Sequence, residues 1–151
     1  MTDTYIVGIG MTPLGKFPDK SVKQLTDDAV NTALKDAGAK LEDIEVAWFS
    51  NTRQGMMEGQ NTVRGQCALR SMGFQSIPIV NVENACCSSS TGLNQALAYL
   101  KAGMAGIADA SCVSSAASCI ACVLGMLCAS TRDGCATTTH GFIHTVRRLS
   151  P

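Results

Sequence analysis

The chain has no excess of charge of either sign and few aromatic residues. Its 151 residues include 12 Lys or Arg and 12 Asp or Glu, and only 5% are Phe, Trp or Tyr. Proteins that bind nucleic acid or an anionic membrane surface usually carry a basic patch. The balanced charge of this chain gives no sign of such a patch. We therefore expect neither nucleic acid nor a membrane as a partner, and we favour a small molecule or a protein.

The N-terminus lacks the pattern of a secretory signal, because residues 1–9 contain no basic segment followed by a long apolar run. We therefore expect a cytoplasmic location, in which the eight cysteines would be free thiols rather than disulfides. A hydrophobic content of 46% is normal for a globular protein, and 151 residues suffice for one domain with a core.

The clearest predicted element is an amphipathic helix that follows Ser21. Ser21 suits the N-cap, Gln24 stands at the capping-box position, and Gly38 suits the C-terminal end. Apolar residues recur at helical spacing between these ends, at Val22, Leu25, Ala29, Val30, Ala33, Leu34 and Ala37.

Short apolar runs alternate with helical patterns along the first hundred residues. Strands are predicted at residues 4–10, 45–50 and 77–82, a turn of helix at 41–44, and helical segments at 63–69 and 93–101. This alternation is typical of an α/β fold, in which a mostly parallel sheet is covered by helices. We expect the first two strands to pair in parallel.

The composition changes near Met104. Between residues 102 and 130 the only charged residue is Asp109, and five of the eight cysteines lie in the last third of the chain. Residues 110–129 carry no charge, but four serines dilute the run, which favours a partly buried helix over a transmembrane one. The predicted organisation is a domain at residues 1–105 and an atypical Ser/Cys-rich tail at residues 106–151.

A cluster of small residues that carries two cysteines joins the strand predicted at 77–82 to the helix predicted at 93–101. It reads Val82-Glu83-Asn84-Ala85-Cys86-Cys87-Ser88-Ser89-Ser90. Unpaired N–H groups and the helix dipole at a helix N-terminus favour the thiolate, which is the reactive form of cysteine. A nucleophile is therefore predicted here, and Cys86 is the first candidate, with Cys87 more suited to a packing position.

Three segments of the chain resemble the N-terminal part of the thiolase superfamily, in particular the lipid-transfer-protein (sterol-carrier-protein x) thiolases and acetyl-CoA acetyltransferases. They are residues 5–12, residues 59–64 and the segment from Val82 to Cys86. The resemblance implies a thiolase-like α/β fold, of which this chain would hold part of the N-terminal half. It also implies that Cys86 attacks an acyl-CoA carbonyl and holds the acyl group as a thioester. CoA thioester would then be the substrate, with no bound cofactor; which residues bind it is left open.

Two departures from the family pattern stand close to Cys86. The family usually has glycine where this chain has Ser89, and alanine where it has Gly92. We expect the resemblance to end near Ala105, before the family's second half, which supplies an activating histidine and a second cysteine. His140 and His144 match none of its motifs. We therefore predict a truncated thiolase that is inactive alone. For its tail, translation in the native reading frame and in a non-native one both stay open.

A second interpretation stays open, in which the chain is a non-catalytic thiolase-fold fragment. It would bind thiolase-type subunits through residues 51–70, as a homo- or hetero-oligomer. No metal is expected, because Cys119, Cys122, His140 and His144 are poorly spaced for a zinc site. A peroxisomal location stays open for a eukaryotic source, although the chain does not end in a peroxisomal signal.

Overall fold

The computed structural model describes residues 3–115, 119–130 and 147–148, and the side chains of residues 3–113. Its six-stranded sheet has the order β3-β2-β4-β5-β1-β6. The strands are β1 (Asp3–Met11), β2 (Val46–Ser50), β3 (Ile79–Val82), β4 (Ile107–Ser115), β5 (Cys119–Ser130) and β6 (Arg147–Arg148). The helices are α1 (Val22–Ala37), α2 (Gln54–Glu58), α3 (Arg64–Ser71) and α4 (Ser88–Lys101), with 3-10 turns η1 (Leu41–Asp43) and η2 (Ala85–Cys87).

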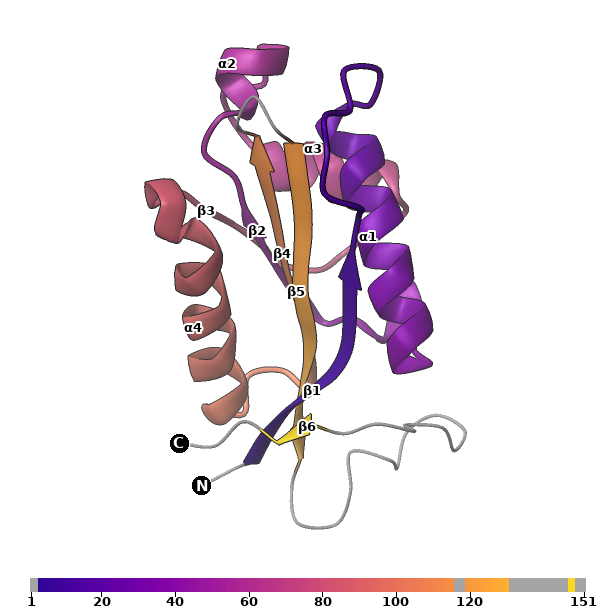
Figure 1. Cartoon of the computed structure of the whole chain (residues 1–151). Helices are drawn as coiled ribbons and strands as arrows, with labels where there is room; N and C mark the ends of the chain where they lie inside the picture. Colours follow the sequence, from indigo (N-terminus) through magenta and orange to yellow (C-terminus); the bar gives the residue numbers. More distant parts are fainter. Residues whose placement is uncertain (1–2, 116–118, 131–146, 149–151) are drawn as a thin grey trace.

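The sheet separates two layers of helices. Figure 1 shows α1 and α3 on one side of it and α4 on the other, with α2 beyond one end of the strands. Strands β3, β2 and β4 are mutually parallel, whereas β5 is antiparallel to both β4 and β1. This arrangement confirms the predicted α/β class. Although β1 runs in the same direction as β2, the two do not pair, because β4 and β5 lie between them.

Helix α1 confirms the capping pattern of its sequence. The Ser21 side chain accepts a hydrogen bond from the Gln24 backbone, the Gln24 side chain accepts one from the Ser21 backbone, and Gly38 ends the helix in the left-handed region at φ 65°. All seven predicted apolar positions are buried against the sheet. The helix therefore forms because local capping and the apolar stripe agree.

The helix predicted at 110–129 is wrong, because residues 107–115 form β4 and residues 119–130 form β5. Helices cover both faces of the sheet, so β4 buries both of its faces. Ala108 and Ala110 pack in the core beneath α4, and Val113 packs in the core beneath α1. A strand buried on both faces has a continuous small and apolar sequence, which periodicity cannot distinguish from a buried helix. Within the described residues, no helix is long and apolar enough to cross a membrane.

Strand β2 is buried along its whole length and supplies both cores. Ala47 and Phe49 face the core beneath α1 and α3, whereas Val46 and Trp48 face the core beneath α4. The Trp48 ring also meets that of Tyr99 edge-on, with 5.3 Å between ring centroids. Strand β2 thus contributes side chains to the core on each side of the sheet.

Helix α4 lies close to β2 at Gly92. A Cβ atom added there would lie 2.6 Å from the Ser50 Oγ, and that hydroxyl donates a 3.0 Å hydrogen bond to the Ser88 carbonyl. The absence of a side chain at Gly92 leaves room for the Ser50 side chain, so the departure from the alanine of the resembled family has a steric reason.

Asp109 is a carboxyl group buried within the sheet, 1% exposed. The Ser111 hydroxyl donates to its Oδ2 over 3.0 Å, and its Oδ1 has no partner in the described residues. Burial raises the pKa of Asp109 to about 7, and the hydrogen bond from Ser111 opposes that rise only in part.

We predict that replacement of Gly92 and replacement of Ser50 are coupled. Gly92→Ala should lower the free energy of unfolding by about 1–3 kcal/mol through overpacking. Ser50→Ala removes the clashing hydroxyl, so the double variant should lose less stability than the sum of the two single variants. Urea denaturation measures this, with the exposed Asn94→Ala in α4 as the additive control. Strict additivity of Gly92→Ala and Ser50→Ala would contradict the close approach.

We predict that stability falls as pH rises through the titration of Asp109. The native state keeps the proton up to about pH 7, whereas the unfolded chain releases it near its ordinary pKa of 3.8. The free energy of unfolding should therefore drop between these values by up to about 1.4 kcal/mol per pH unit. Asp109→Asn should flatten this slope in urea denaturation, and the exposed Asp19→Asn should leave it unchanged. Equal slopes in both variants would refute the prediction.

Candidate active site

Cys86 lies in the turn between the end of β3 and the start of α4. The chain leaves β3 at Val82, passes through η2 and enters α4 at Ser88 (Figure 1). Cys86 and Cys87 are both exposed and are not in disulfides. The helix begins five residues before the predicted position, so the strand, the cysteine and the helix N-terminus are closer together than the sequence pattern indicated.

The residue before Cys86 has an unusual backbone conformation. Ala85 has φ 45°, in the left-handed region that residues with a Cβ atom rarely adopt. Its N–H donates to the Glu83 Oε1 over 2.8 Å, and the Cys87 N–H closes the turn onto the Asn84 carbonyl over 2.9 Å. Such conformations persist where neighbouring groups hold them, and they cluster at functional sites.

The hydroxyl groups of Ser88 and Thr52 form hydrogen bonds with the backbone of this turn. The Ser88 Oγ donates to the Ala85 carbonyl over 2.8 Å and accepts from the Asn84 N–H over 2.7 Å. The Thr52 Oγ1 lies 3.1 Å from both the Ala85 carbonyl and the Ser88 Oγ. With Ser50, these residues form a polar cluster at the carboxyl edge of the parallel strands. Ser50 and Thr52 were not predicted as site residues, although they stand at the end of a parallel strand, where sites form in such sheets.

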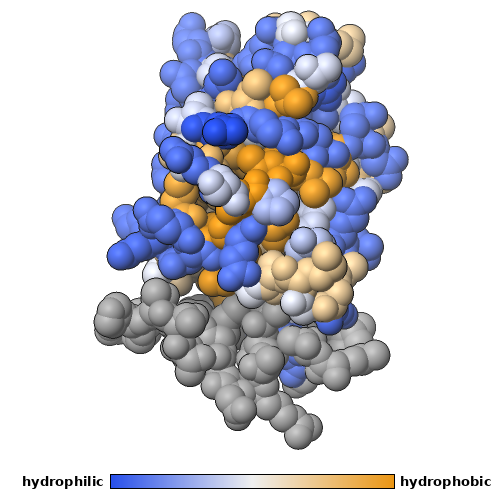
Figure 2. All heavy atoms as spheres, turned by 180° about the vertical axis from the view of Figure 1, so that it is seen from behind, coloured by the Kyte–Doolittle hydropathy of each residue, from blue (hydrophilic) through white to orange (hydrophobic). Residues whose placement is uncertain are grey.

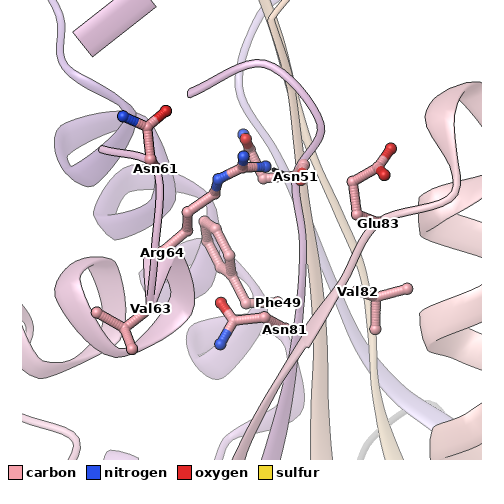
Figure 3. Close-up of a pocket in the computed structure, with 8 residues that line it drawn as sticks. All are labelled: Phe49, Asn51, Asn61, Val63, Arg64, Asn81, Val82 and Glu83. Carbon is pink, nitrogen blue, oxygen red and sulfur yellow. Dashed lines mark hydrogen bonds between the residues drawn. The ribbon is translucent and has the colours of Figure 1, made fainter. Parts of the chain in front are cut away.

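A hollow of about 330 Å³ lies beside the turn. Its lining residues are Phe49, Asn51, Asn61, Val63, Arg64, Asn81, Val82 and Glu83. Figure 3 shows the Arg64 side chain extending across the middle of the group toward Asn51, with Glu83 on the far side. The Arg64 Nη1 donates to the Asn51 carbonyl over 2.7 Å, and the Gly65 N–H donates to the Asn81 Oδ1 over 2.6 Å.

Two of the three segments that carry the family resemblance meet at this hollow. Arg64 ends the segment 59–64, and Val82 and Glu83 belong to the segment that leads to Cys86. The third segment, residues 5–12, lies in and just after β1, which is separated from β2 by β4 and β5. The structure thus brings residues 59–64 and the segment from Val82 to Cys86 together, whereas residues 5–12 lie elsewhere in the sheet.

Of the four residues considered for a zinc site, two lie in a described strand and two do not. His140 and His144 lie outside the described residues, whereas Cys119 and Cys122 lie in β5. Among the described residues, no group of three His, Cys, Asp or Glu side chains could hold a metal ion.

Several known proteins are similar to this chain over part of their length. "Non-specific lipid-transfer protein-like 2" of Caenorhabditis elegans is 42% identical over 92 residues, which are 59% of this chain and 21% of the relative. An acetyl-CoA acetyltransferase of Methanocaldococcus jannaschii is 31% identical over 107 residues, 71% of this chain and 27% of the relative. The chain thus spans about a quarter or less of the length of these relatives.

Solved structures share the fold at low sequence identity. The Acat5 thiolase of Ascaris suum in complex with coenzyme A has a TM-score of 0.66 and 19% identity, over 75% of this chain and 30% of that one. The 3-oxoacyl-[acyl-carrier-protein] synthase III of Aquifex aeolicus has a TM-score of 0.69 and 11% identity, over 86% of this chain and 55% of that one.

A family model described as the N-terminal domain of thiolase matches residues 4–123. This range includes β4 and the first part of β5, so the resemblance does not stop near Ala105 as the sequence analysis expected. The fold, the relatives and the family match agree, and the chain belongs to the thiolase family through its N-terminal domain.

Proposed function

We propose that this chain carries the nucleophile of a thiolase-type acyltransferase that acts on acyl-CoA, and that the nucleophile is Cys86. The observation that carries the proposal is the position of this exposed thiol between β3 and α4, directly after the left-handed Ala85. The family membership and the acetyl-CoA acetyltransferase relative support the acyl-CoA substrate.

The first chemical step follows from the properties of a thiolate. The Cys86 sulfur attacks the carbonyl carbon of the acyl-CoA, a new C–S bond forms, and the bond between that carbon and the CoA sulfur breaks. CoA leaves as a thiolate and takes up a proton, while the acyl group stays on Cys86 as a thioester. N–H groups at the start of α4 are suited to stabilise the oxyanion of the tetrahedral intermediate.

The second step needs a group that moves a proton to or from the acyl acceptor. The side chains of residues 3–113 include no histidine, and both histidines of the chain lie elsewhere. We therefore propose that the 151 residues alone form the acyl-enzyme slowly and do not complete turnover.

A second candidate is a non-catalytic subunit that associates through residues 51–70. Three large apolar side chains in that segment are exposed, namely Met56 at 80%, Met57 at 52% and Val63 at 54%. Figure 2 also shows an apolar area in the middle of the face turned away from the viewer of Figure 1, with polar residues around it. Exposed apolar groups of this kind are typical of association surfaces.

Alkylation tests whether Cys86 is a reactive thiol. We predict that a small excess of iodoacetamide at neutral pH modifies Cys86 first, because it is exposed and lies just before the positive end of α4. Peptide mass spectrometry locates the label, and Cys86→Ser should remove the fast phase whereas Cys87→Ser should keep it. Equal labelling of all eight cysteines would contradict a formed nucleophile turn.

Acyl transfer separates the two candidates. We predict that the chain incubated with acetyl-CoA gains one acetyl group on Cys86, seen by intact-mass and peptide analysis, and that Cys86→Ser gains none. Thiolysis of acetoacetyl-CoA should show no sustained turnover, because the described side chains of residues 3–113 include no histidine to transfer the proton. Absence of any adduct on a folded chain would favour the non-catalytic subunit, and thiolysis at ordinary enzyme rates would contradict the predicted inactivity.

A further inference from the structure

We propose that Thr52 is a positioning residue for Cys86, which it holds in place through the backbone of the preceding turn. The catalytic meaning of this role rests on the proposed function of Cys86. The positioning itself is a property of the turn and can be measured without any acyl substrate.

Thr52 connects two elements that are far apart in the sequence. It lies in the segment between β2 and α2, 36 residues from Ser88, and its side chain is half-buried. Its Oγ1 is 3.1 Å from the Ala85 carbonyl and 3.1 Å from the Ser88 Oγ. The other bonds to that carbonyl and hydroxyl come from inside the turn, so Thr52 is the side chain that fastens the turn to the segment after β2.

The hydroxyl protons can satisfy the cluster in two ways. When Ser88 donates to the Ala85 carbonyl, Thr52 donates to the Ser88 Oγ; when Thr52 donates to that carbonyl, Ser88 donates to the Thr52 Oγ1. The Ser88 Oγ accepts the Asn84 N–H in both arrangements. Both residues before Cys86 are therefore tied to the same pair of hydroxyls, and a cluster with every group satisfied is rigid.

The conformation of Ala85 explains why this pair matters. An alanine at φ 45° is strained, and it returns to a commoner conformation unless surrounding bonds oppose the change. Rotation at Ala85 would redirect the following residue, which is Cys86, relative to the start of α4. Loss of the Thr52 hydroxyl should thus alter the reactivity of Cys86 more than that of Cys87, which is anchored by its own N–H to the Asn84 carbonyl.

Site-resolved alkylation of Thr52 variants tests the proposal. Iodoacetamide is applied to the 151-residue chain, and the ratio of the labelling rates of Cys86 and Cys87 is measured by peptide mass spectrometry. Thr52→Val keeps the shape of the side chain and should lower this ratio about fivefold, the effect expected from the loss of one hydrogen bond. Thr52→Ser keeps the hydroxyl and should restore the ratio to within about twofold.

The matched control is Thr32→Val, because the Thr32 Oγ1 also donates to a backbone carbonyl, that of Asp28 in α1, over 2.7 Å. It should leave the ratio unchanged. Circular dichroism checks that each variant is folded, and Thr52→Ala serves as a second hydroxyl deletion if Thr52→Val unfolds. An unchanged ratio in a folded Val or Ala variant would overturn the proposal, as would a Ser variant that behaves like Val.

Unfolding of both hydroxyl deletions would also overturn it, because the hydroxyl would then maintain the fold rather than the turn. Failure of the proposed function has a different result, in which wild-type Cys86 accepts no acetyl group from acetyl-CoA while the labelling ratio still responds to Thr52.

Discussion

The complete burial of β2 is the constraint on which the rest of the structure depends. Its first four residues point alternately into the two cores, and its backbone pairs in parallel with β3 on one side and β4 on the other. Because alternate side chains of a strand face opposite ways, a shift of β2 by one residue against its neighbours would move each of its side chains into the opposite core. The register of β2 therefore determines where β3 ends and where the segment after Ser50 meets the turn that contains Cys86.

The candidate active site follows from this register. Ser50 and Thr52 come from the end of β2, and the turn at residues 85–87 comes from the end of the neighbouring parallel strand, so their polar groups meet at one edge of the sheet. The small residue Gly92 lets α4 lie close enough to β2 for the Ser50 hydroxyl to reach the Ser88 carbonyl. Packing thus supports the turn that contains Cys86, and the chemistry proposed for Cys86 depends on contacts between residues far apart in the sequence.

Membership of the thiolase family accounts for the architecture but leaves individual residues to be explained. The family match extends from β1 into β5. Gly92 is explained by a contact within this chain, namely its close approach to the Ser50 hydroxyl. Exposed apolar residues in the segment that includes α2, such as Met56, are compatible with the association that both proposed functions allow. The relatives are several times longer than the matched region.

Features that depend on neighbours a few residues apart were determined by the sequence itself. The capping box at Ser21 and Gln24, the apolar stripe of α1 and the order of strand, cysteine and helix around Cys86 are of this kind, because propensity and periodicity act locally. Only the tertiary structure decided that residues 107–115 and 119–130 form strands, that Thr52 meets Ala85, and that burial raises the pKa of Asp109. Those outcomes depend on which distant segments cover a residue, and a linear pattern of residue types does not contain that information.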